Sequence, residues 1–366
     1  MDLVIYGAQG LALGACRAIK NLYPQRNIQC FLVTSQEGNT DCLDHLPVVE
    51  LNTYVKNMSD EQKDRTEILI ATPENVMPEI EKSLDLCGLY HHVRLDSRRW
   101  STLMAYHYSA EKHFTPLSSL PVGYHRAELS VYMAKFYKDK ELSGDYQIPE
   151  WITPIQVGAA LCDTRVARVL DNQGDDHISE KNVNYSELTG LYWLWKNELI
   201  SMDHVDKESS NNKYYGLVHY RRMLTLSEDD LLRLVDNDVD VVLPYPMPYE
   251  PNIEAHHQRY LKDVDWKALI RALTELEPEY AARLSEVMNQ QYLCNYNIIV
   301  ARKDVLREYC EWLFPILKRV EEISEPQGSM RSDRYIGYMG ETLETIYFML
   351  NRDRYNVTYA GCNFMI

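Results

Sequence analysis

The sequence is short of positive charge and of long apolar stretches. Its 366 residues carry 38 Lys and Arg against 54 Asp and Glu, which gives a formal net charge of −16. A protein that binds nucleic acid non-specifically needs a basic face, so this composition argues against a nucleic-acid partner. No stretch approaches the roughly 20 apolar residues of a membrane-spanning helix. We therefore expect at most a peripheral association with a membrane.

Paired cysteines are missing as well. The eight Cys are scattered, with neither a C-x-x-C pair nor the spacing of a zinc site. Cysteines of this kind are typical of reduced, buried thiols in the cytoplasm. The opening MDLVIYGAQG lacks the positive segment and the long apolar run of a secretory signal. These features predict a cytoplasmic protein, which could work at the inner face of a membrane.

Phenylalanine is scarce and tyrosine takes its place. The sequence has 6 Phe but 27 Tyr. A Tyr ring offers a flat apolar face with a hydroxyl at its edge, which suits stacking on sugars or bases. A plain bias in composition explains the same number equally well. Hydrophobic residues at 45% and charged residues at 25% are ordinary for a globular protein, and the length suffices for two domains.

The first residues have the pattern that opens a Rossmann-like unit. A short apolar strand at 3–6 leads into a glycine turn and then into a helix. The glycines are Gly7, Gly10 and Gly14. Their pattern departs from G-x-G-x-x-G at the second glycine, and Thr34 and Ser35 stand where a ribose-binding acid is expected. Nucleotide binding and tight helix–sheet packing both explain the glycines, and we favour packing slightly.

Further strands are predicted at 29–33 and 67–71, where short apolar runs are bounded by polar residues. The alternation of strands with helices predicts an α/β fold. We divide the chain into a Rossmann-like domain at 1–100, a linker at 101–127 and a second α/β domain at 128–366.

The segment 178–197, ISEKNVNYSELTGLYWLWKN, predicts a helix that begins near Tyr185. Asn184 followed three residues later by Glu187 has the spacing of a capping box. An apolar stripe then recurs at helical spacing and predicts a face packed on the core. The stripe comprises Leu188, Tyr192, Trp195 and Leu199.

Polar side chains beside this stripe are not explained by packing. Asn182, Glu187 and Thr189 carry hydrogen-bonding groups that a simple packing helix does not need so near its buried face. We expect these three side chains to line a cleft together with His219. Tyr192 and Trp195 should instead be buried away from the ligand.

Three runs of sequence resemble one bacterial family. They are I-S-x-K-N, Y-S-E-L-T-G-L-Y-W-L-W-K-N and, at 216–222, G-L-V-H-Y-R-R. The family was long labelled a domain of unknown function, and its members sit among enzymes that build capsular and O-antigen polysaccharides. It is associated with glycosyl transfer, including galactofuranosyl transfer from a UDP-sugar. The resemblance covers roughly 129 to the C-terminus and leaves out the first hundred or so residues.

The resemblance implies a GT-A-like glycosyltransferase domain at 128–366 with a UDP-sugar donor and a glycan or lipid-linked glycan acceptor. In that fold the first strand ends beside the donor base, where the family commonly carries Thr-His-Lys. This chain has Ala134, Lys135 and Phe136 there, and Lys135 is the residue that could meet phosphate. In the next predicted strand, Gly158 lets a ligand or a backbone come close.

The strand predicted at 214–218 runs directly into His219, Tyr220, Arg221 and Arg222. In the implied fold this strand normally ends in Asp-x-Asp, whose carboxylates hold a divalent metal. Here the position holds cations, and Arg can stabilise the charge of the departing UDP through bidentate hydrogen bonds. We therefore assign His219, Arg221 and Arg222 to substrate binding. Because neighbours in a strand point to opposite faces, we expect only one of the two Arg in the site.

No residue is assigned to a metal, and Mn²⁺ or Mg²⁺ remains an open alternative to the cations. Asn295 and Asn297 open a strand predicted at 292–301. By the resemblance, this is the strand whose Asn contacts the donor sugar.

Glu341 is our choice for the base that takes the proton of the acceptor hydroxyl. It follows a two-glycine turn at the expected start of a helix. Arg331 and Arg334 are expected to keep it ionised by favouring its charged form. Glu187 is the reserve candidate, because capping of its own helix would occupy it.

These inferences favour a hexosyltransferase that inverts the anomeric centre. The alternative is a non-catalytic nucleotide-sugar binding or assembly protein of polysaccharide biosynthesis, because Asp-x-Asp is missing and the N-terminal glycines are degenerate. A Rossmann oxidoreductase ranks last, since no Tyr-x-x-x-Lys follows. The donor sugar, the acceptor and the oligomeric state stay open.

Overall fold

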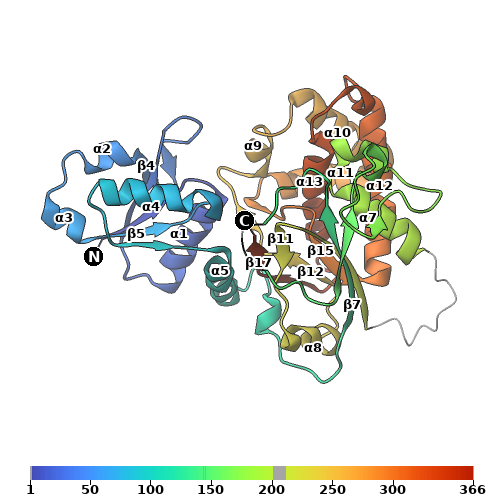
Figure 1. The fold of residues 1–366 in the computed structure, drawn as a ribbon, viewed down its shortest axis with the longest axis horizontal. Coiled ribbons are helices and arrows are strands. Elements are labelled where there is room, and N and C mark those ends of the chain that lie inside the picture. Colours follow the sequence, from blue (N-terminus) through green and yellow to red (C-terminus); the bar gives the residue numbers. More distant parts are fainter. Residues whose placement is uncertain (1, 143, 145, 201–211, 366) are drawn as a thin grey trace.

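The computed structural model describes residues 2–142, 144, 146–200 and 212–365. The chain forms two mixed α/β parts that lie side by side, each built on its own sheet (Figure 1). Figure 1 shows the N-terminal part in blue and the larger C-terminal part in green to red, with α5 between them.

The N-terminal sheet has six strands in the order β3-β4-β2-β1-β5-β6. All neighbours pair in parallel except β3, which runs antiparallel to β4. Central parallel strands are covered on both faces, which explains the continuous apolar runs of β1 and β2. The strands are β1 (Asp2–Tyr6), β2 (Ile28–Val33), β3 (Cys42–Leu43), β4 (Leu46–Glu50), β5 (Thr66–Ile70) and β6 (His92–Arg94). The helices are α1 (Gly10–Leu22), α2 (Leu51–Val55), α3 (Asp60–Asp64), α4 (Met77–Leu86) and α5 (Ser97–Glu111), with 3₁₀ turns η1 (Glu74–Val76) and η2 (Leu117–Ser119).

The glycines of α1 allow the two parts of the chain to pack closely. A Cβ on Gly10 would lie 3.3 Å from atoms of Met247, Pro248 and Tyr249, which belong to the C-terminal part. A Cβ on Gly14 would lie 3.5 Å from Cδ of Pro248. A side chain at Gly10 would therefore crowd the C-terminal part, and one at Gly14 would lie against both that part and Trp100 of α5, at 3.4 Å.

Helix α5 occupies much of the segment expected to be a linker. Nε1 of Trp100 donates to the carbonyl oxygen of Leu11 in α1 at 3.2 Å. The hydroxyl of Tyr108 donates to the carbonyl oxygen of Pro246 at 2.9 Å. The helix therefore binds α1 on one side and the C-terminal part on the other.

The C-terminal sheet has nine strands. Its main path is β16-β12-β15-β10-β7-β8-β9, and β11 pairs with β10 and β17. β10, β7, β8 and β9 are parallel to one another, whereas β15 runs antiparallel to both β10 and β12. The strands are β7 (Glu128–Lys135), β8 (Ile152–Gln156), β9 (Val169–Leu170), β10 (Lys213–His219), β11 (Arg222–Leu224), β12 (Val241–Pro244), β15 (Ile299–Arg302), β16 (Val357–Ala360) and β17 (Cys362–Phe364). A separate pair is formed by β13 (Met247–Pro248) and β14 (Tyr292–Leu293).

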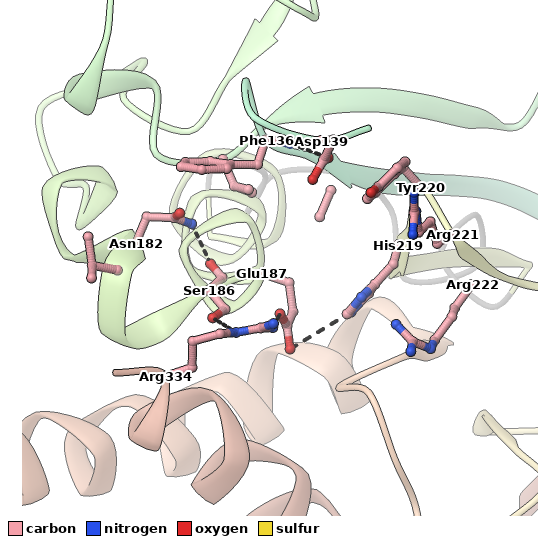
Figure 2. A pocket seen from close by; sticks show the side chains of 13 residues that line it. Phe136, Asp139, Asn182, Ser186, Glu187, His219, Tyr220, Arg221, Arg222 and Arg334 are labelled. Atoms are coloured by element: carbon pink, nitrogen blue, oxygen red, sulfur yellow. Dashed lines mark hydrogen bonds and ion pairs between the residues drawn. The ribbon is translucent and has the colours of Figure 1, made fainter. Parts of the chain in front are cut away.

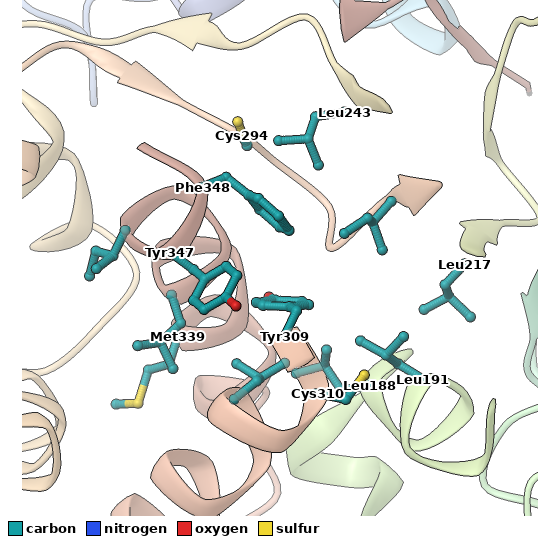
Figure 3. Close-up of a cluster of buried hydrophobic side chains, with 14 of the residues drawn as sticks. Leu188, Leu191, Leu217, Leu243, Cys294, Tyr309, Cys310, Met339, Tyr347 and Phe348 are labelled. Carbon is teal, nitrogen blue, oxygen red and sulfur yellow. The ribbon is translucent and has the colours of Figure 1, made fainter. Parts of the chain in front are cut away.

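Helices cover this sheet and enclose its core. α12 packs against α10, α13, β10 and β15. Figure 3 shows the apolar side chains that meet there, including Leu188 of α7, Leu217 of β10, Tyr309 of α12 and Phe348 of α13. The helices are α6 (Asn182–Tyr185), α7 (Leu188–Leu194), α8 (Glu228–Asp236), α9 (Ile253–His257), α10 (Asp263–Leu276), α11 (Pro278–Met288), α12 (Lys303–Ile323) and α13 (Tyr335–Leu350), with short turns η3 (Ala159–Leu161), η4 (Ser179–Lys181), the π-helical η5 (Trp195–Leu199) and η7 (Gly328–Met330). None of the described helices combines the length and the apolarity needed to cross a membrane.

The segment 178–197 is broken where one helix was expected. α6 ends at Tyr185, and the next residue, Ser186, has a φ of 53° and a ψ of −131° that interrupt the helix before α7 begins. The predicted capping box is wrong, because the amide of Asn184 donates to the carbonyl oxygen of Asp333 at 2.8 Å. The apolar stripe does pack on the core, as Leu188, Trp195 and Leu199 are buried. The prediction that Tyr192 is buried is wrong, because it is partly exposed and its hydroxyl donates to Oδ1 of Asp176 at 2.7 Å.

Candidate functional site

A cavity of about 390 Å³ opens at the carboxyl ends of β7, β8 and β10. In the sheet, β8 lies on one side of β7 and β10 lies on the other side. The cavity therefore lies where the order of the strands reverses. In open α/β sheets, ligands bind in the crevice at this point. Figure 2 shows the lining side chains, which are those of Ala134, Phe136, Asp139, Val157, Asn182, Val183, Ser186, Glu187, His219, Tyr220, Arg221, Arg222 and Arg334.

The HYRR segment is a tight turn at this cavity. β10 ends at His219, the chain turns through Tyr220 and Arg221, and Arg222 opens β11 opposite His219. The expectation that only one of the two arginines faces the site is wrong, because strand alternation stops where the chain turns. Both arginines line the cavity.

The arginines of the cavity have donor groups to spare. The guanidinium of Arg222 lies over the ring of Tyr296, 4.1 Å from its centroid, and that of Arg221 lies 5.2 Å from the ring centroid of Tyr220. Nε of Arg221 is buried without a hydrogen-bond partner among the described residues. Arg334 reaches the cavity from the residue before α13, with 59% of its side chain exposed. Guanidinium groups that line a cavity together, two of them partly buried, favour binding of an anion there.

Glu187 is the carboxylate at the centre of the lining. Nδ2 of Asn297 donates to its Oε1 at 2.6 Å, and Nη2 of Arg334 donates to its Oε2 at 3.3 Å. Nε2 of His219 lies 3.8 Å from Oε1. The side chain is only 6% exposed. These contacts hold the carboxylate of Glu187 in position at the cavity wall.

His219 is a neutral polar group in this setting. Burial lowers the pKa of His219, and the charges of Arg222 and Arg334 lower it further, whereas Glu187 raises it. Its Nε2 has no hydrogen-bond partner in the part of the chain that the structure describes. The imidazole therefore adds no charge to the cavity wall at neutral pH.

Glu341 lies in the second turn of α13, which begins at Tyr335 and not at Glu341. Burial raises the pKa of Glu341 to about 8, and the charge of Glu187 raises it too. The backbone of Tyr296 and the guanidinium of Arg222 act in the opposite direction. Glu341 therefore holds a proton in most molecules at neutral pH.

The expectation that Arg331 and Arg334 keep Glu341 ionised is wrong. Nη2 of Arg331 is committed elsewhere, to Oδ2 of Asp265 at 2.8 Å and to Oδ2 of Asp333 at 2.6 Å. The charge of Arg334 lowers the pKa of Glu341, but burial outweighs it.

Asn182 lines the cavity, and two other predicted residues lie behind it. Its Nδ2 donates to the carbonyl oxygen of Ser186 at 2.7 Å and to Oγ1 of Thr189 at 3.1 Å. A Cβ on Gly158, whose φ is 64°, would lie 2.9 Å from Oδ1 of Asn182. Thr189 and Gly158 therefore hold Asn182 in place, and neither is among the lining residues of this described cavity.

Asn295 and Asn297 lie in the loop between β14 and β15, so the single strand predicted at 292–301 is wrong. The left-handed backbone of Asn297, with φ of 50°, breaks the strand there. Asn297 holds Glu187, as described above, while Oδ1 of Asn295 accepts a hydrogen bond from the hydroxyl of Tyr249 at 3.4 Å. Both amides are buried behind the cavity lining.

Lys135 points away from the cavity, contrary to its predicted role. Alternation along β7 places Ala134 in the lining, whereas Lys135 lines a separate cavity.

Asp139, which lines both cavities, is a residue for which the sequence predicted no role. Oδ2 of Asp139 accepts the backbone N–H of Phe136 at 2.7 Å, and burial raises the pKa of Asp139. Its signal in the sequence is an acidic residue just beyond a strand that ends at the site.

The carboxylates that line the cavity are Glu187 and Asp139. Within the described ranges, no group of three or more His, Cys, Asp or Glu side chains is arranged to hold a metal ion. The guanidinium groups of Arg221, Arg222 and Arg334 are the groups of this cavity that could bind an anion.

The fold and the cavity define an α/β protein with an arginine-lined cavity at the carboxyl ends of parallel strands in a mixed sheet. Residues 138–352, more than half of the chain, match the family described as Domain of unknown function (DUF4422), and the chain belongs to that family. No curated protein matches the chain.

Two solved structures were compared with the chain. The apo structure of the WbbM bifunctional glycosyltransferase is 26% identical, with a TM-score of 0.52, over 65% of this chain and 45% of that one. The chain thus spans less than half of that protein. The Mn/GDP form of core-mannan synthase A (CmsA/Ktr4) from Aspergillus fumigatus is 12% identical, with a TM-score of 0.28, over 69% and 79% of the two chains. The similarity to the first structure supports a glycosyltransferase-like fold.

Proposed function

We propose that the chain is a glycosyltransferase that moves a hexose from a UDP-sugar to a glycan acceptor. The observation that carries the proposal is the cavity at the carboxyl edge of the sheet, which Arg221, Arg222 and Arg334 line together with Glu187. Similarity to a bifunctional glycosyltransferase supports the reaction class. UDP-galactofuranose is the first donor to test, because of the motifs between residues 178 and 222. The product would be a capsular or O-antigen polysaccharide.

The architecture supports the same proposal. The order of the C-terminal strands, with β15 antiparallel inside an otherwise mostly parallel path, supports a GT-A-like domain at 128–366. The parallel six-stranded sheet supports a Rossmann-like domain at 1–100, with 101–127 as the connection.

The arginines would bind the diphosphate of the donor. When the bond between the sugar and UDP breaks, negative charge grows on the β-phosphate. Fixed guanidinium groups stabilise this charge most strongly in the transition state, where the charge is largest. Arg221 and Arg222, which line the cavity, would donate to the phosphate oxygens. Mn²⁺ or Mg²⁺ would then contribute little.

The two glutamates would have different roles. Both oxygens of Glu187 already have cationic or amide partners, so we assign it to contact with the transferred sugar. We assign Glu341 as the base, because a pKa of about 8 suits proton acceptance near neutral pH. The acceptor oxygen bonds to the anomeric carbon and its proton goes to Glu341. The bond from that carbon to the phosphate oxygen breaks, and its electron pair leaves with UDP. Attack on the face opposite UDP inverts the centre.

The acceptor would be a growing glycan, free or lipid-linked, and the reaction would run in the cytoplasm at the inner face of a membrane. The eight cysteines are all free, which suits a reducing compartment.

A thermal-shift panel of nucleotide-sugars tests the proposal first, with manganese and with excess EDTA. A ligand that binds the folded state raises its melting temperature, so UDP and UDP-sugars should do so in both conditions. Transfer is then measured as UDP release from UDP-galactofuranose, with water as the basal acceptor. Binding without release of UDP would favour the alternative, a non-catalytic nucleotide-sugar binding protein. Release that EDTA abolishes and manganese restores would contradict the role given to the arginines.

A further inference from the structure

Four aromatic side chains contact one another in a row, from Tyr249 through His256 and Tyr260 to Tyr338. Tyr249 stacks on His256 with centroids 3.5 Å apart, His256 meets Tyr260 at 5.0 Å, and Tyr260 meets Tyr338 at 5.4 Å. The rings come from the loop after β13, from α9 and the turn that follows it, and from α13.

The row begins at the groups that the proposed reaction uses. Tyr338 lies four residues after Arg334 and three residues before Glu341, so the three side chains share one face of the helix. At the other end, the hydroxyl of Tyr249 bonds Oδ1 of Asn295 at 3.4 Å, and the charge of Glu341 acts on the hydroxyl of Tyr249. Both ends of the row therefore reach the surroundings of Glu341.

The outer rings of the row are open to solvent. Tyr260 is 51% exposed and Tyr338 is partly exposed, whereas His256 is buried beneath them. A single exposed aromatic residue is ordinary on a protein surface. Here the exposed ring of Tyr260 contacts two further rings, those of His256 and Tyr338, which restrict its orientation.

We propose that Tyr260 and Tyr338 form the platform on which the ring of the acceptor sugar stacks, with its reacting hydroxyl turned toward Glu341. This inference rests on the proposed glycosyltransferase function. A hexose offers one face of C–H groups to an aromatic ring and hydroxyls at its rim, which suits rings bordered by tyrosine hydroxyls, Asn295 and Glu341. The platform stands on the α9 and α13 side, whereas the arginines that would bind the donor diphosphate stand at the ends of β10 and before α13. Donor and acceptor would thus meet between Glu187 and Glu341.

The experiment uses the full chain with UDP-galactofuranose as donor and octyl glycosides of galactose, glucose and N-acetylglucosamine as acceptor probes. Tyr260→Ala and Tyr338→Ala should each raise the KM for the best octyl glycoside about fivefold to tenfold, the range expected for loss of one aromatic contact. UDP binding and the basal release of UDP to water should stay at the parent value. Tyr260→Phe and Tyr260→Trp should keep the acceptor KM near that of the parent, because they keep the ring.

Tyr124→Ala is the matched control, since that ring is 94% exposed and belongs to the segment before β7. It should leave every value unchanged. An unchanged acceptor KM in both Tyr260→Ala and Tyr338→Ala would overturn the platform, as would a parent that releases UDP to water but uses no glycoside. A parent that neither binds UDP-sugars nor releases UDP would instead overturn the proposed function itself.

Discussion

Two glutamates near the cavity differ in their surroundings, and the difference decides what each can do. Glu187 is held by Asn297 and Arg334, both of which donate to its oxygens. Glu341 lies in α13, and burial of its carboxyl group raises its pKa to about 8. The first carboxylate is held in position by hydrogen bonds, while the second can exchange a proton near neutral pH.

The pH dependence of transfer should follow Glu341. The base must be ionised, so kcat/KM should rise with pH below about 8 and level off above it. Glu341→Gln should remove this rise and most of the transfer while UDP affinity stays near that of the parent. A pH series of transfer rates in parent and variant checks the prediction. A Glu341→Gln variant that transfers normally would rule out the assignment, and Glu187→Gln, assayed in parallel, would then become the test of the reserve base.

Glu341 also affects stability in a defined direction. Its pKa in the folded chain lies above the ordinary value of 4.5, so between these values the folded state holds a proton that the unfolded state has released. The free energy of unfolding therefore falls as pH rises from 4.5 to about 8. Glu341→Gln should unfold with a weaker pH dependence across this window, as measured by urea denaturation at pH 5, 7 and 8.5. An identical slope in parent and variant would contradict the buried, protonated carboxyl.

Loss of a guanidinium from the turn after β10 should weaken UDP binding. Arg221→Ala and Arg222→Ala each remove charged hydrogen bonds worth roughly 1.5–3 kcal/mol, about 10-fold to 150-fold in Kd. Both positions should respond, because both line the cavity. Isothermal titration with UDP measures the change. Arg271→Ala is the control, since that guanidinium pairs with Glu275 on the surface of α10. Parent-like affinity in both cavity variants would make the turn purely structural.

At the scale of elements, the close contact of α13 with α7 and the Asn297 loop depends on one glycine. A Cβ on Gly340 would lie 2.6 Å from Oδ1 of Asn297 and 2.7 Å from Cδ1 of Leu188. One turn earlier, a Cβ on Gly337 would lie 3.4 Å from Oγ of Ser186, an ordinary contact. The two glycines thus differ in the room that is available for a side chain, although both lie in α13.

Gly340→Ala and Gly337→Ala form a matched pair of variants. Overpacking should destabilise Gly340→Ala by about 1–3 kcal/mol, and the displaced Asn297 should lower transfer by releasing Glu187. Gly337→Ala should be neutral or more stable by up to about 1 kcal/mol, because Ala favours a helix over Gly. Urea denaturation and transfer assays measure both effects. Equal stabilities in the two variants would show that the backbone of α13 shifts freely at Gly340.

Parts of the fold could not be predicted from the sequence because they depend on contacts between residues that are distant along the chain. The strand that leads into His219 follows from local apolar pattern, and the structure has it at Lys213–His219. The turn at Tyr220 and Arg221 carries no Gly, Pro or Asn, so local signals predicted a continuing strand. It forms because β11 pairs with β17 near the end of the chain. The bond from Asn297 to Glu187 spans 110 residues, which no local pattern encodes.

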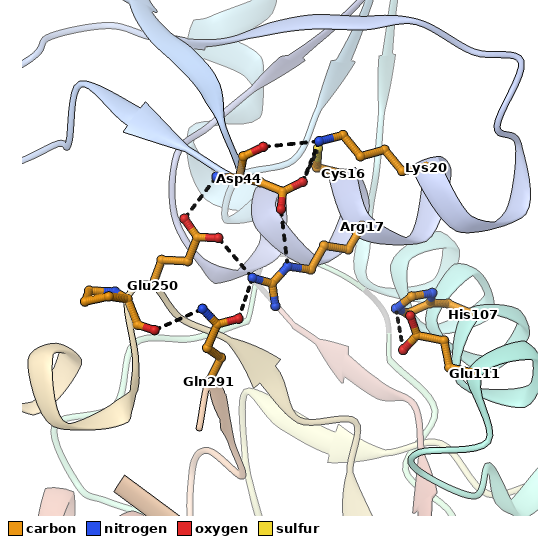
Figure 4. Close-up of polar contacts among 9 residues, drawn as sticks. Cys16, Arg17, Lys20, Asp44, His107, Glu111, Glu250 and Gln291 are labelled. Carbon is orange, nitrogen blue, oxygen red and sulfur yellow. Dashed lines mark hydrogen bonds and ion pairs between the residues drawn. The ribbon is translucent and has the colours of Figure 1, made fainter. Parts of the chain in front are cut away.

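At the scale of the whole molecule, charged groups join the two parts of the chain. Nη2 of Arg17 in α1 donates to Oε1 of Glu250 at 3.0 Å and to Oε1 of Gln291 at 2.7 Å. The backbone N–H of Asp44 donates to Oε2 of Glu250 at 2.9 Å (Figure 4). Glu250 follows Tyr249, the first ring of the aromatic row, so the N-terminal part supports the segment that carries the row.

A double-mutant cycle on Arg17 and Glu250 should measure how strongly the two parts are joined. The pair is mostly shielded from solvent, with 17% and 26% of the side chains exposed, so its coupling energy should exceed that of a surface pair. We expect about 1 kcal/mol or more for Arg17→Ala combined with Glu250→Ala, since residues in one hydrogen-bond network are not additive. The control cycle is Arg283 with Glu286, an exposed pair within α11, for which about 0.2–0.5 kcal/mol is expected. Urea unfolding gives the four stabilities of each cycle. Additive effects in the Arg17 and Glu250 cycle would show that apolar packing of α1 on β13, and not this ion pair, holds the two parts together.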